Sequence, residues 1–458
     1  MSQGNAAALG TASEIAANVR ARSLSAVEAA TACLDRIQAL DQKLHAFQVV
    51  RAERALDEAA AIDRLSDRSG LPLAGVPVAI KDNFNVAGEP TRMGSAATDA
   101  TPAQADDELV RRLRGAGAVV IGKTTMPELA IFGFTESAAY GITRNPWNLE
   151  RSPGGSTGGG AVAVATGMAP LALATDGLGS IRGPATFCGV FGLKPTRDRL
   201  PLMQGLKEHW YGLSVTGPIA WSVKDAALML DVLGGTRDFQ NVRSPSAHLR
   251  VAVSTKSPSF LTKPAPEVVA AVRETAAILK DAGHSITEAD PPYPNTLASA
   301  IMRLWTAGVA QDAQKLNWGS LEPRTRSMAR IGRLLGPASG QVIQRWATRA
   351  STWFGDFDVA VMPAVARSSI PAGGWTGRGF VSTALDQIRA LPFNAPWNVA
   401  GFPAASVPSG IGPEGVPLSV QLVAPAQRES VILELALQLE SIRPWQRVPS
   451  SWASSRAG

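Results

Sequence analysis

A helical pattern of apolar residues runs through the first part of the chain. The apolar residues that follow Ser25 recur every three or four positions: Val27, Ala30, Leu34, Ile37 and Leu40. This spacing is typical of a helix with one buried face. Thr11 with Glu14 and Ser25 with Glu28 have the spacing of capping boxes, which mark where helices begin. The pattern therefore predicts N-terminal helices over residues 1–70.

Beyond residue 70 the pattern changes to short apolar runs bounded by glycine, proline or polar residues. These runs are Val76–Ile80, Ala118–Gly122, Leu171–Ala174, Asp358–Met362, Ala404–Val407 and Leu418–Val423. Runs of this length are typical of buried strands. Helical patterns cover Asp107–Gly115, the segment from Pro127, Ala161–Thr166 and Ser430–Ile442. Strands that alternate with helices from end to end predict an α/β fold.

The chain has no clean linker, so a single domain over residues 1–458 is predicted. After the N-terminal helices, a core is expected over 71–235. A more polar, variable helical region is expected over 236–350. Strands and a last helix over 351–458 are expected to complete the sheet of the core.

Charge and cysteine content narrow the class of partner. Lys and Arg total 44 against 38 Asp and Glu, but this excess is spread along 458 residues, whereas a nucleic-acid footprint gathers on one face. The longest apolar stretch, Ala161–Ala174, is broken by Gly167 and Pro170 and is too short to cross a bilayer. Two cysteines, Cys33 and Cys188, make no disulfide framework. The sequence therefore predicts a cytoplasmic protein with no nucleic-acid or membrane partner.

The candidate chemistry depends on which catalytic groups the chain offers. Its four histidines have no His or Cys at metal-ligand spacing, so no metal is expected. No Gly-rich nucleotide-binding motif occurs, so no cofactor is expected either. Lys81 directly follows an apolar run, where burial would lower the pKa of its amine and make it a base. By itself the position also fits a solvated lysine in a turn.

The segment Gly154–Thr196 is the richest in glycine and the poorest in charge. It reads GGSTGGG at 154–160, TDGLGSIR at 175–182 and PATFCGVFGLKPT at 184–196. It closely resembles the signature of the amidase signature family, which has a GGSS-type loop, a TDTGGSIR-type loop and the string P-A-x-x-C-G-x-x-G-L-K-P-T. Further stretches similar to the family are Gly75–Asn83, Gly122–Leu129, Gly217–Ala220, Ala395–Ala404 and Val416–Val423.

This resemblance implies a fold and a set of catalytic roles. The fold is one domain with a mixed sheet of about eleven strands, covered by helices on both faces. Ser180 matches the nucleophile, Ser156 the bridging serine that the family holds on a cis peptide bond, and Lys81 the lysine base. A proton would pass from the nucleophile through the bridging serine to the lysine. The expected oxyanion hole consists of backbone N–H groups of Gly177, Leu178, Gly179 and Ser180.

The chain departs from the family pattern at a few positions. Leu178 stands where the family usually has glycine, keeps the N–H group, and is expected to add an apolar wall to the pocket. Thr157 replaces the second serine of the GGSS pair, keeps a hydroxyl and is expected to have a supporting role. Thr125 replaces a common asparagine. None of these changes removes a member of the expected catalytic set.

Two charged residues flank the matched nucleophile. Arg182 is expected to pair with Asp176 and brace the loop, because a buried charge needs a partner. The alternative role for Arg182 is binding of a substrate carboxylate. Cys188 is an alternative nucleophile, although a small buried side chain is the expected role for it.

The resemblance implies hydrolysis of a carboxamide C–N bond through an acyl-enzyme on Ser180, with aryl amides, esters and carbamates (urethanes) as related small-molecule substrates. An alternative is the glutaminase and transamidation subunit of a tRNA-dependent amidotransferase. That branch usually carries a tyrosine-glycine-arginine stretch after L-K-P-T, whereas this chain continues with Arg197–Pro201. A monomer or homodimer is expected. Specificity is expected to depend on segments 132–147, 199–212 and 300–380.

Overall fold

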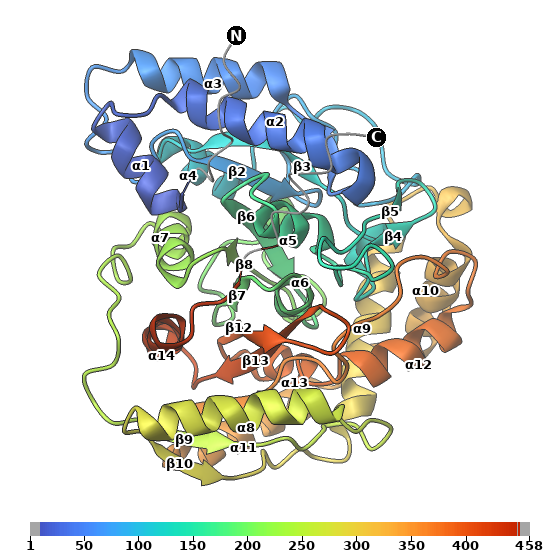
Figure 1. Cartoon of the computed structure of the whole chain (residues 1–458). Helices are drawn as coiled ribbons and strands as arrows, with labels where there is room; N and C mark the ends of the chain where they lie inside the picture. The colour runs from blue at the N-terminus through green and yellow to red at the C-terminus, as the bar shows by residue number, and fades with distance from the viewer. Residues whose placement is uncertain (1–9, 447, 449–458) are drawn as a thin grey trace.

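A computed structural model describes residues 10–446 and 448 of the chain (Figure 1). Its first helices are α1 (Ala12–Arg20), α2 (Ala26–Leu44) and α3 (Ala52–Arg64). Both predicted capping boxes are present, at the start of α1 and of α2. The predicted helical character of this part is confirmed, with one addition: strand β1 (Phe47–Val50) lies between α2 and α3.

The core of the molecule is a sheet of eleven strands in the order β1-β3-β2-β6-β8-β7-β12-β13-β11-β9-β10. The further strands of this sheet are β2 (Pro77–Lys81), β3 (Val119–Thr124), β6 (Leu171–Asp176), β7 (Phe191–Lys194), β8 (Val215–Ala220), β9 (Arg250–Val253), β10 (Ser285–Glu288), β11 (Val359–Pro363), β12 (Ala404–Ile411) and β13 (Pro417–Val423). The sheet is mixed, because β2 runs parallel to β3 and β6, while β6 runs antiparallel to β8. A separate small ribbon joins β4 (Glu136–Ser137) to β5 (Gly141–Ile142).

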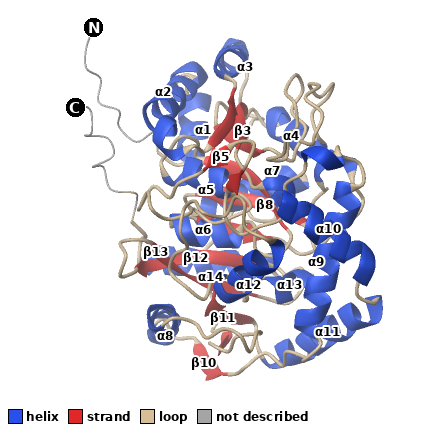
Figure 2. Cartoon of the chain, turned by 90° about the vertical axis from the view of Figure 1, so that its right-hand side faces the viewer, coloured by secondary structure: helices blue, strands red, loops and turns tan. Residues whose placement is uncertain are grey.

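Helices cover both faces of this sheet (Figure 2). They include α4 (Glu108–Gly115), α5 (Gly158–Ala165), α6 (Arg182–Cys188), α7 (Val223–Gly234), α8 (Pro266–Asp281), α9 (Leu297–Ala313), α10 (Pro323–Leu335), α11 (Gly340–Trp353), α12 (Phe380–Ala390), α13 (Ala395–Ala400) and α14 (Glu429–Ile442). Along β2, Val78 and Ile80 belong to the apolar cluster that contains α7 and α14, whereas Ala79 belongs to the cluster of α5. A strand buried on both faces reads as a continuous apolar run, which is why β2 could be recognised from the sequence.

Some expected helical segments differ in the structure. The region 236–350 contains β9 and β10 at the edge of the sheet as well as helices. β10 is largely exposed and polar, so it carries no apolar run that would predict a strand. The helix expected from Pro127 is a single 3-10 turn over Glu128–Ala130, because the chain turns into a left-handed conformation at Leu129 and Ala130.

The sheet topology brings the candidate catalytic segments together. β2 ends at Lys81 and its parallel neighbour β6 ends at Asp176. Since parallel strands end at the same edge of a sheet, loops that follow them meet there, where α/β proteins commonly bind their ligands. In the part of the chain that the structure describes, no helix is long and apolar enough to span a bilayer.

Candidate active site

Lys81 is fully buried at the end of β2, and its amine has hydroxyl partners. Nζ lies 2.7 Å from Oγ of Ser156 and 3.0 Å from Oγ1 of Thr175. Asn83 donates to the same Thr175 oxygen at 3.0 Å. The carboxylate of the next residue, Asp82, is paired with Lys123 at 2.8 Å. The immediate neighbours of the Lys81 amine are therefore neutral oxygens.

Burial lowers the pKa of Lys81 to about 7, against the opposing effect of the charge on Asp176. Removing an ammonium group from water disfavours its charged form, and no carboxylate bonds it directly to restore that form. A neutral amine has a free lone pair, so it can accept a proton from a hydroxyl 2.7 Å away. The surroundings of Lys81 therefore suit a base that works at neutral pH without histidine.

Ser156 lies in the tight glycine loop between β5 and α5, and the peptide bond Gly155–Ser156 is cis. A Cβ atom at Gly155 would stand 2.5 Å from the carbonyl oxygens of Phe132 and Phe134, so only glycine fits there. The N–H of Thr157, the N-cap of α5, donates to the carbonyl of Ser180 at 3.3 Å. This bond joins the loops of the two candidate catalytic serines.

The letters of residues 154–158 also match the G-x-S-x-G elbow of α/β-hydrolases. In that elbow a strand leads into the nucleophile and a histidine activates it. Here no strand leads directly into Ser156, and its hydroxyl faces Lys81. The local structure is therefore different from that elbow.

The Asp176 side chain accepts hydrogen bonds from the backbone of the loop that carries Ser180. The carboxylate accepts from the N–H groups of Gly179 at 2.7 Å and Ile181 at 3.1 Å. The Gly179 N–H, one of the four expected oxyanion donors, is thus bonded to Asp176 in this structure. The N–H groups of Gly177, Leu178 and Ser180 are the members of the expected set that remain for a substrate oxyanion.

Asp176 and Arg182 form a fully buried ion pair at 2.9 Å. The guanidinium also donates to the Asn394 carbonyl and to the side chains of Gln421 and Asn398. Burial alone would raise the pKa of Asp176, but the charge and hydrogen bonds of Arg182 and a bond from Asn398 hold it well below its usual range. With its donors directed at protein acceptors and no exposed surface, Arg182 braces the loop and does not face the pocket.

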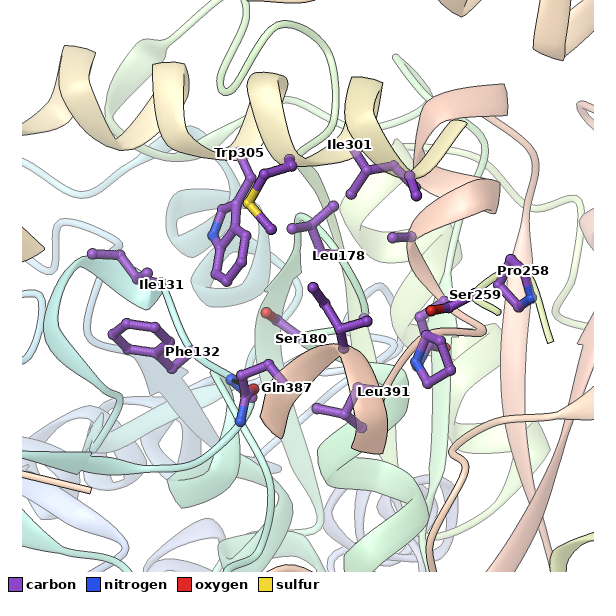
Figure 3. A pocket seen from close by; sticks show the side chains of 18 of the residues that line it. Ile131, Phe132, Leu178, Ser180, Pro258, Ser259, Ile301, Trp305, Gln387 and Leu391 are labelled. Carbon is purple, nitrogen blue, oxygen red and sulfur yellow. Dashed lines mark hydrogen bonds between the residues drawn. The ribbon is translucent and has the colours of Figure 1, made fainter. Parts of the chain in front are cut away.

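A largely apolar pocket opens above Ser180, with a volume of about 910 Å³ that includes its mouth to solvent (Figure 3). Loop 130–133, α9 and α12 supply much of its wall. Leu178 lines the pocket beside Ser180, in the position expected for an apolar wall. Other large lining residues are Ile131, Phe132, Trp210, Ile301, Met302, Trp305, Ile388 and Leu391.

Buried polar residues fix the wall around Phe132. The guanidinium of Arg324 lies 4.9 Å from the centre of the Phe132 ring and donates to the Trp375 carbonyl at 2.8 Å. Gln387 accepts from the Gly133 N–H at 2.6 Å and ties α12 to the same loop. These contacts were not foreseen from the sequence, because positions 132–133, 324, 375 and 387 lie in different parts of the chain and share no motif.

Two other side chains with nucleophilic atoms, those of Cys188 and Ser214, occupy different surroundings. Cys188 is fully buried, and burial raises the pKa of its thiol, which keeps it protonated. Ser214 is bonded to Nδ1 of His209 at 2.7 Å. Across residues 10–446 and 448, no group of three or more His, Cys, Asp or Glu is arranged to hold a metal ion.

Comparison with known proteins identifies the family of this chain. A family model described as Amidase matches residues 28–433. The chain belongs to the amidase signature family. The family and the names of the relatives agree with hydrolysis of a carboxamide C–N bond, the reaction that the signature implies.

Individual relatives cover nearly the whole chain. Amidase AmiB2 of Mycobacterium tuberculosis is 46% identical over 91% of this chain and 93% of its own length. The acylamidase of Rhodococcus erythropolis is 33% identical over 95% of this chain and 96% of its own length. A solved structure of 6-aminohexanoate cyclic dimer hydrolase superposes with a TM-score of 0.84 at 31% identity, covering 96% of this chain and 98% of the other. The eleven-stranded mixed sheet expected from the resemblance is therefore confirmed.

Proposed function

We propose that the protein hydrolyses carboxamides with Ser180 as nucleophile, Ser156 as proton bridge and Lys81 as base. The observation that carries this proposal is the 2.7 Å contact between the buried amine of Lys81 and the Ser156 hydroxyl. Lys81 takes a proton from Ser156, which takes one from Ser180 as its oxygen attacks the amide carbon. The new C–O bond forms and the carbonyl π electrons move to the oxygen.

The resulting oxyanion receives hydrogen bonds from backbone N–H groups at Gly177, Leu178 and Ser180. Each well-placed donor of this kind contributes about 3–4 kcal/mol to the transition state. As the tetrahedral intermediate collapses, the C–N bond breaks and the proton held by Lys81 returns through Ser156 to the leaving amine. Water then attacks the ester on Ser180 by the same proton route, and the acid leaves.

The pocket supports amides with an apolar, flat or slender acyl part as the substrate class. Its wall near Ser180 includes the Leu178 side chain, the Phe132 ring and the Trp305 indole (Figure 3). Aryl amides, and the esters and carbamates that share their shape, fit such a surface. Among the relatives, the acylamidase supports amides as the substrates. The free, buried cysteines Cys33 and Cys188 agree with a cytoplasmic location.

The proposal is tested with purified enzyme and chromogenic anilides, aryl esters and aryl carbamates. Wild type should release the aryl amine, and Ser180→Ala should abolish turnover without loss of stability. A fluorophosphonate should label Ser180 in the wild type, located by mass spectrometry of peptides. Label on Cys188 or Ser214 would contradict the assignment. An enzyme that is inactive alone, but active with a copurified partner subunit and tRNA, would instead favour the amidotransferase alternative.

A further inference from the structure

The indole of Trp210 is buried against the oxyanion loop and lines the pocket. A Cβ atom at Gly177 would stand 2.9 Å from its ring, and a Cβ atom at Gly308 on α9 would stand 2.5 Å from it. Trp210 thus fills the space between the oxyanion loop and α9, and both neighbours must be glycine for the ring to fit. The ring therefore forms the part of the pocket wall that lies next to Gly177 of the oxyanion loop.

Hydrogen bonds to one carboxylate hold this indole in place. Nε1 of Trp210 donates to Oδ2 of Asp312 at 2.8 Å. Nε2 of His209 lies 3.1 Å from the same oxygen, and the two rings stack with centroids 5.2 Å apart. Asp312 is on α9, one turn beyond Gly308. The same helix therefore supplies the glycine that admits the ring and the acceptor that anchors it.

The carboxylate also fixes the proton on His209. A carboxylate can only accept hydrogen bonds, so in the contact with Asp312 the hydrogen lies on Nε2 of His209. In the neutral ring Nδ1 is then an acceptor, and Ser214 donates to it at 2.7 Å. The order Ser214, His209, Asp312 differs from a hydrolytic triad, in which the serine contacts Nε2 and the carboxylate Nδ1. The arrangement of these three residues therefore suits them to hold the Trp210 indole in place, and it does not suit them to activate Ser214 as a nucleophile.

The backbone at this point adopts a conformation that needs such support. Trp210 and Tyr211 have φ values of 51° and 55°, in the left-handed region that bulky residues rarely occupy. Residues in this region persist only where the surroundings determine them. The bonds to Asp312 and the close packing on Gly177 and Gly308 are those surroundings.

We propose that Trp210 sets the width of the acyl pocket beside the oxyanion loop, and that Asp312 and His209 are positioning residues that hold its indole there. The proposal rests on the proposed function, since it concerns the same pocket. It assigns discrimination against branched acyl groups to a residue on loop 199–212 that is anchored to α9. Substrates with a slender acyl part fit beside the indole, while branched ones meet it.

The test measures selectivity with acetanilide as the slender substrate and pivalanilide as the branched one. In the active enzyme the readout is the ratio of kcat/KM for the two anilides, and in a Ser180→Ala background it is the ratio of their Kd values. Trp210→Leu should shift both ratios toward the branched anilide by about tenfold. Asp312→Leu should shift them in the same direction, whereas Asp312→Asn, which keeps an acceptor oxygen, should stay near wild type. Trp318→Leu, the same change at a tryptophan that does not line the pocket, is the matched control.

The double variant Trp210→Leu/Asp312→Leu separates positioning from a general structural role. If Asp312 acts through the indole, adding its change to Trp210→Leu should not move the ratio further. Trp210→Phe is measured beside it, because this variant keeps a ring and folds more readily. An unchanged ratio in Trp210→Leu and Trp210→Phe, or an additive shift in the double variant, overturns the proposal, as does failure of Ser180→Ala to bind either anilide. Binding ratios that shift as expected in an enzyme that hydrolyses no amide would uphold the pocket assignment and sink the proposed function.

Discussion

The buried amine of Lys81 makes a quantitative prediction for the pH dependence of catalysis. Its pKa is lowered to about 7 by burial, and the proposed mechanism needs the neutral form, which exists above the pKa. The neutral fraction is about one in eleven at pH 6 and about ten in eleven at pH 8 for a group with this pKa. The value of kcat/KM should therefore rise about tenfold over this interval and level off above it, since kcat/KM reports groups of the free enzyme.

The assay is the initial rate of aryl amine release at subsaturating anilide, from pH 5 to pH 10, with thermal unfolding measured at each pH to confirm that the enzyme stays folded. Lys81→Met has no titratable group at this position. It should lose most activity on amides, and its remaining activity should no longer show the pH midpoint of the wild type. Lys81→Arg keeps a cation that is never neutral, so it should be inactive at every pH. A midpoint near that of a free lysine, an unchanged midpoint in Lys81→Met, or substantial activity in Lys81→Arg would refute a neutral lysine base.

Three further variants test neighbouring contacts. Leu178→Gly removes apolar surface next to Ser180, so it should weaken a well-fitted aryl amide by about 1–2 kcal/mol and widen the acyl range; an unchanged specificity profile over slender and bulky anilides would contradict its role as a wall. The Thr175 hydroxyl oxygen lies 3.0 Å from the Lys81 amine and stabilises its ammonium form. Thr175→Val removes this oxygen and should lower the pKa of Lys81, so the midpoint of the pH profile should move to lower pH. An unchanged midpoint would show that this hydrogen bond does not affect the pKa of the base. Arg182→Met leaves a buried carboxylate unpaired and should cost about 3–5 kcal/mol of unfolding free energy in urea, and a loss below about 1 kcal/mol would contradict its bracing role.

The sequence was most informative where the chain is both buried and locally determined. β2 and β6 are buried along their whole length and apolar up to their last one or two residues, and the glycine loops carry a long family signature, so the fold and the candidate set Lys81, Ser156 and Ser180 were predictable. The contact of Lys81 with Thr175 was not predicted. It arises because β2 pairs with β6, and the sequence around each residue does not show which strands are neighbours.

The missed features depend on contacts between distant segments. β10 is short and polar and forms a strand only because β9 offers a partner. Trp210 was one of eleven tryptophans, and its place in the pocket is set by Asp312, 102 residues further along the chain. No periodicity or motif encodes such long-range choices.

The proposed catalytic groups and the pocket walls come from different elements of the fold, and this separation affects how the substrate range of the enzyme can change by mutation. The groups proposed to do the chemistry come from the buried ends of β2 and β6 and from the loops next to α5 and α6. The walls that contact the acyl group come mainly from α9, α12 and loop 130–133. Substitutions at wall positions such as Ile301 and Met302 leave the lysine and both serines untouched. A mutant library confined to these helices should therefore yield new substrate ranges from folded, active enzymes far more often than one directed at the glycine loops.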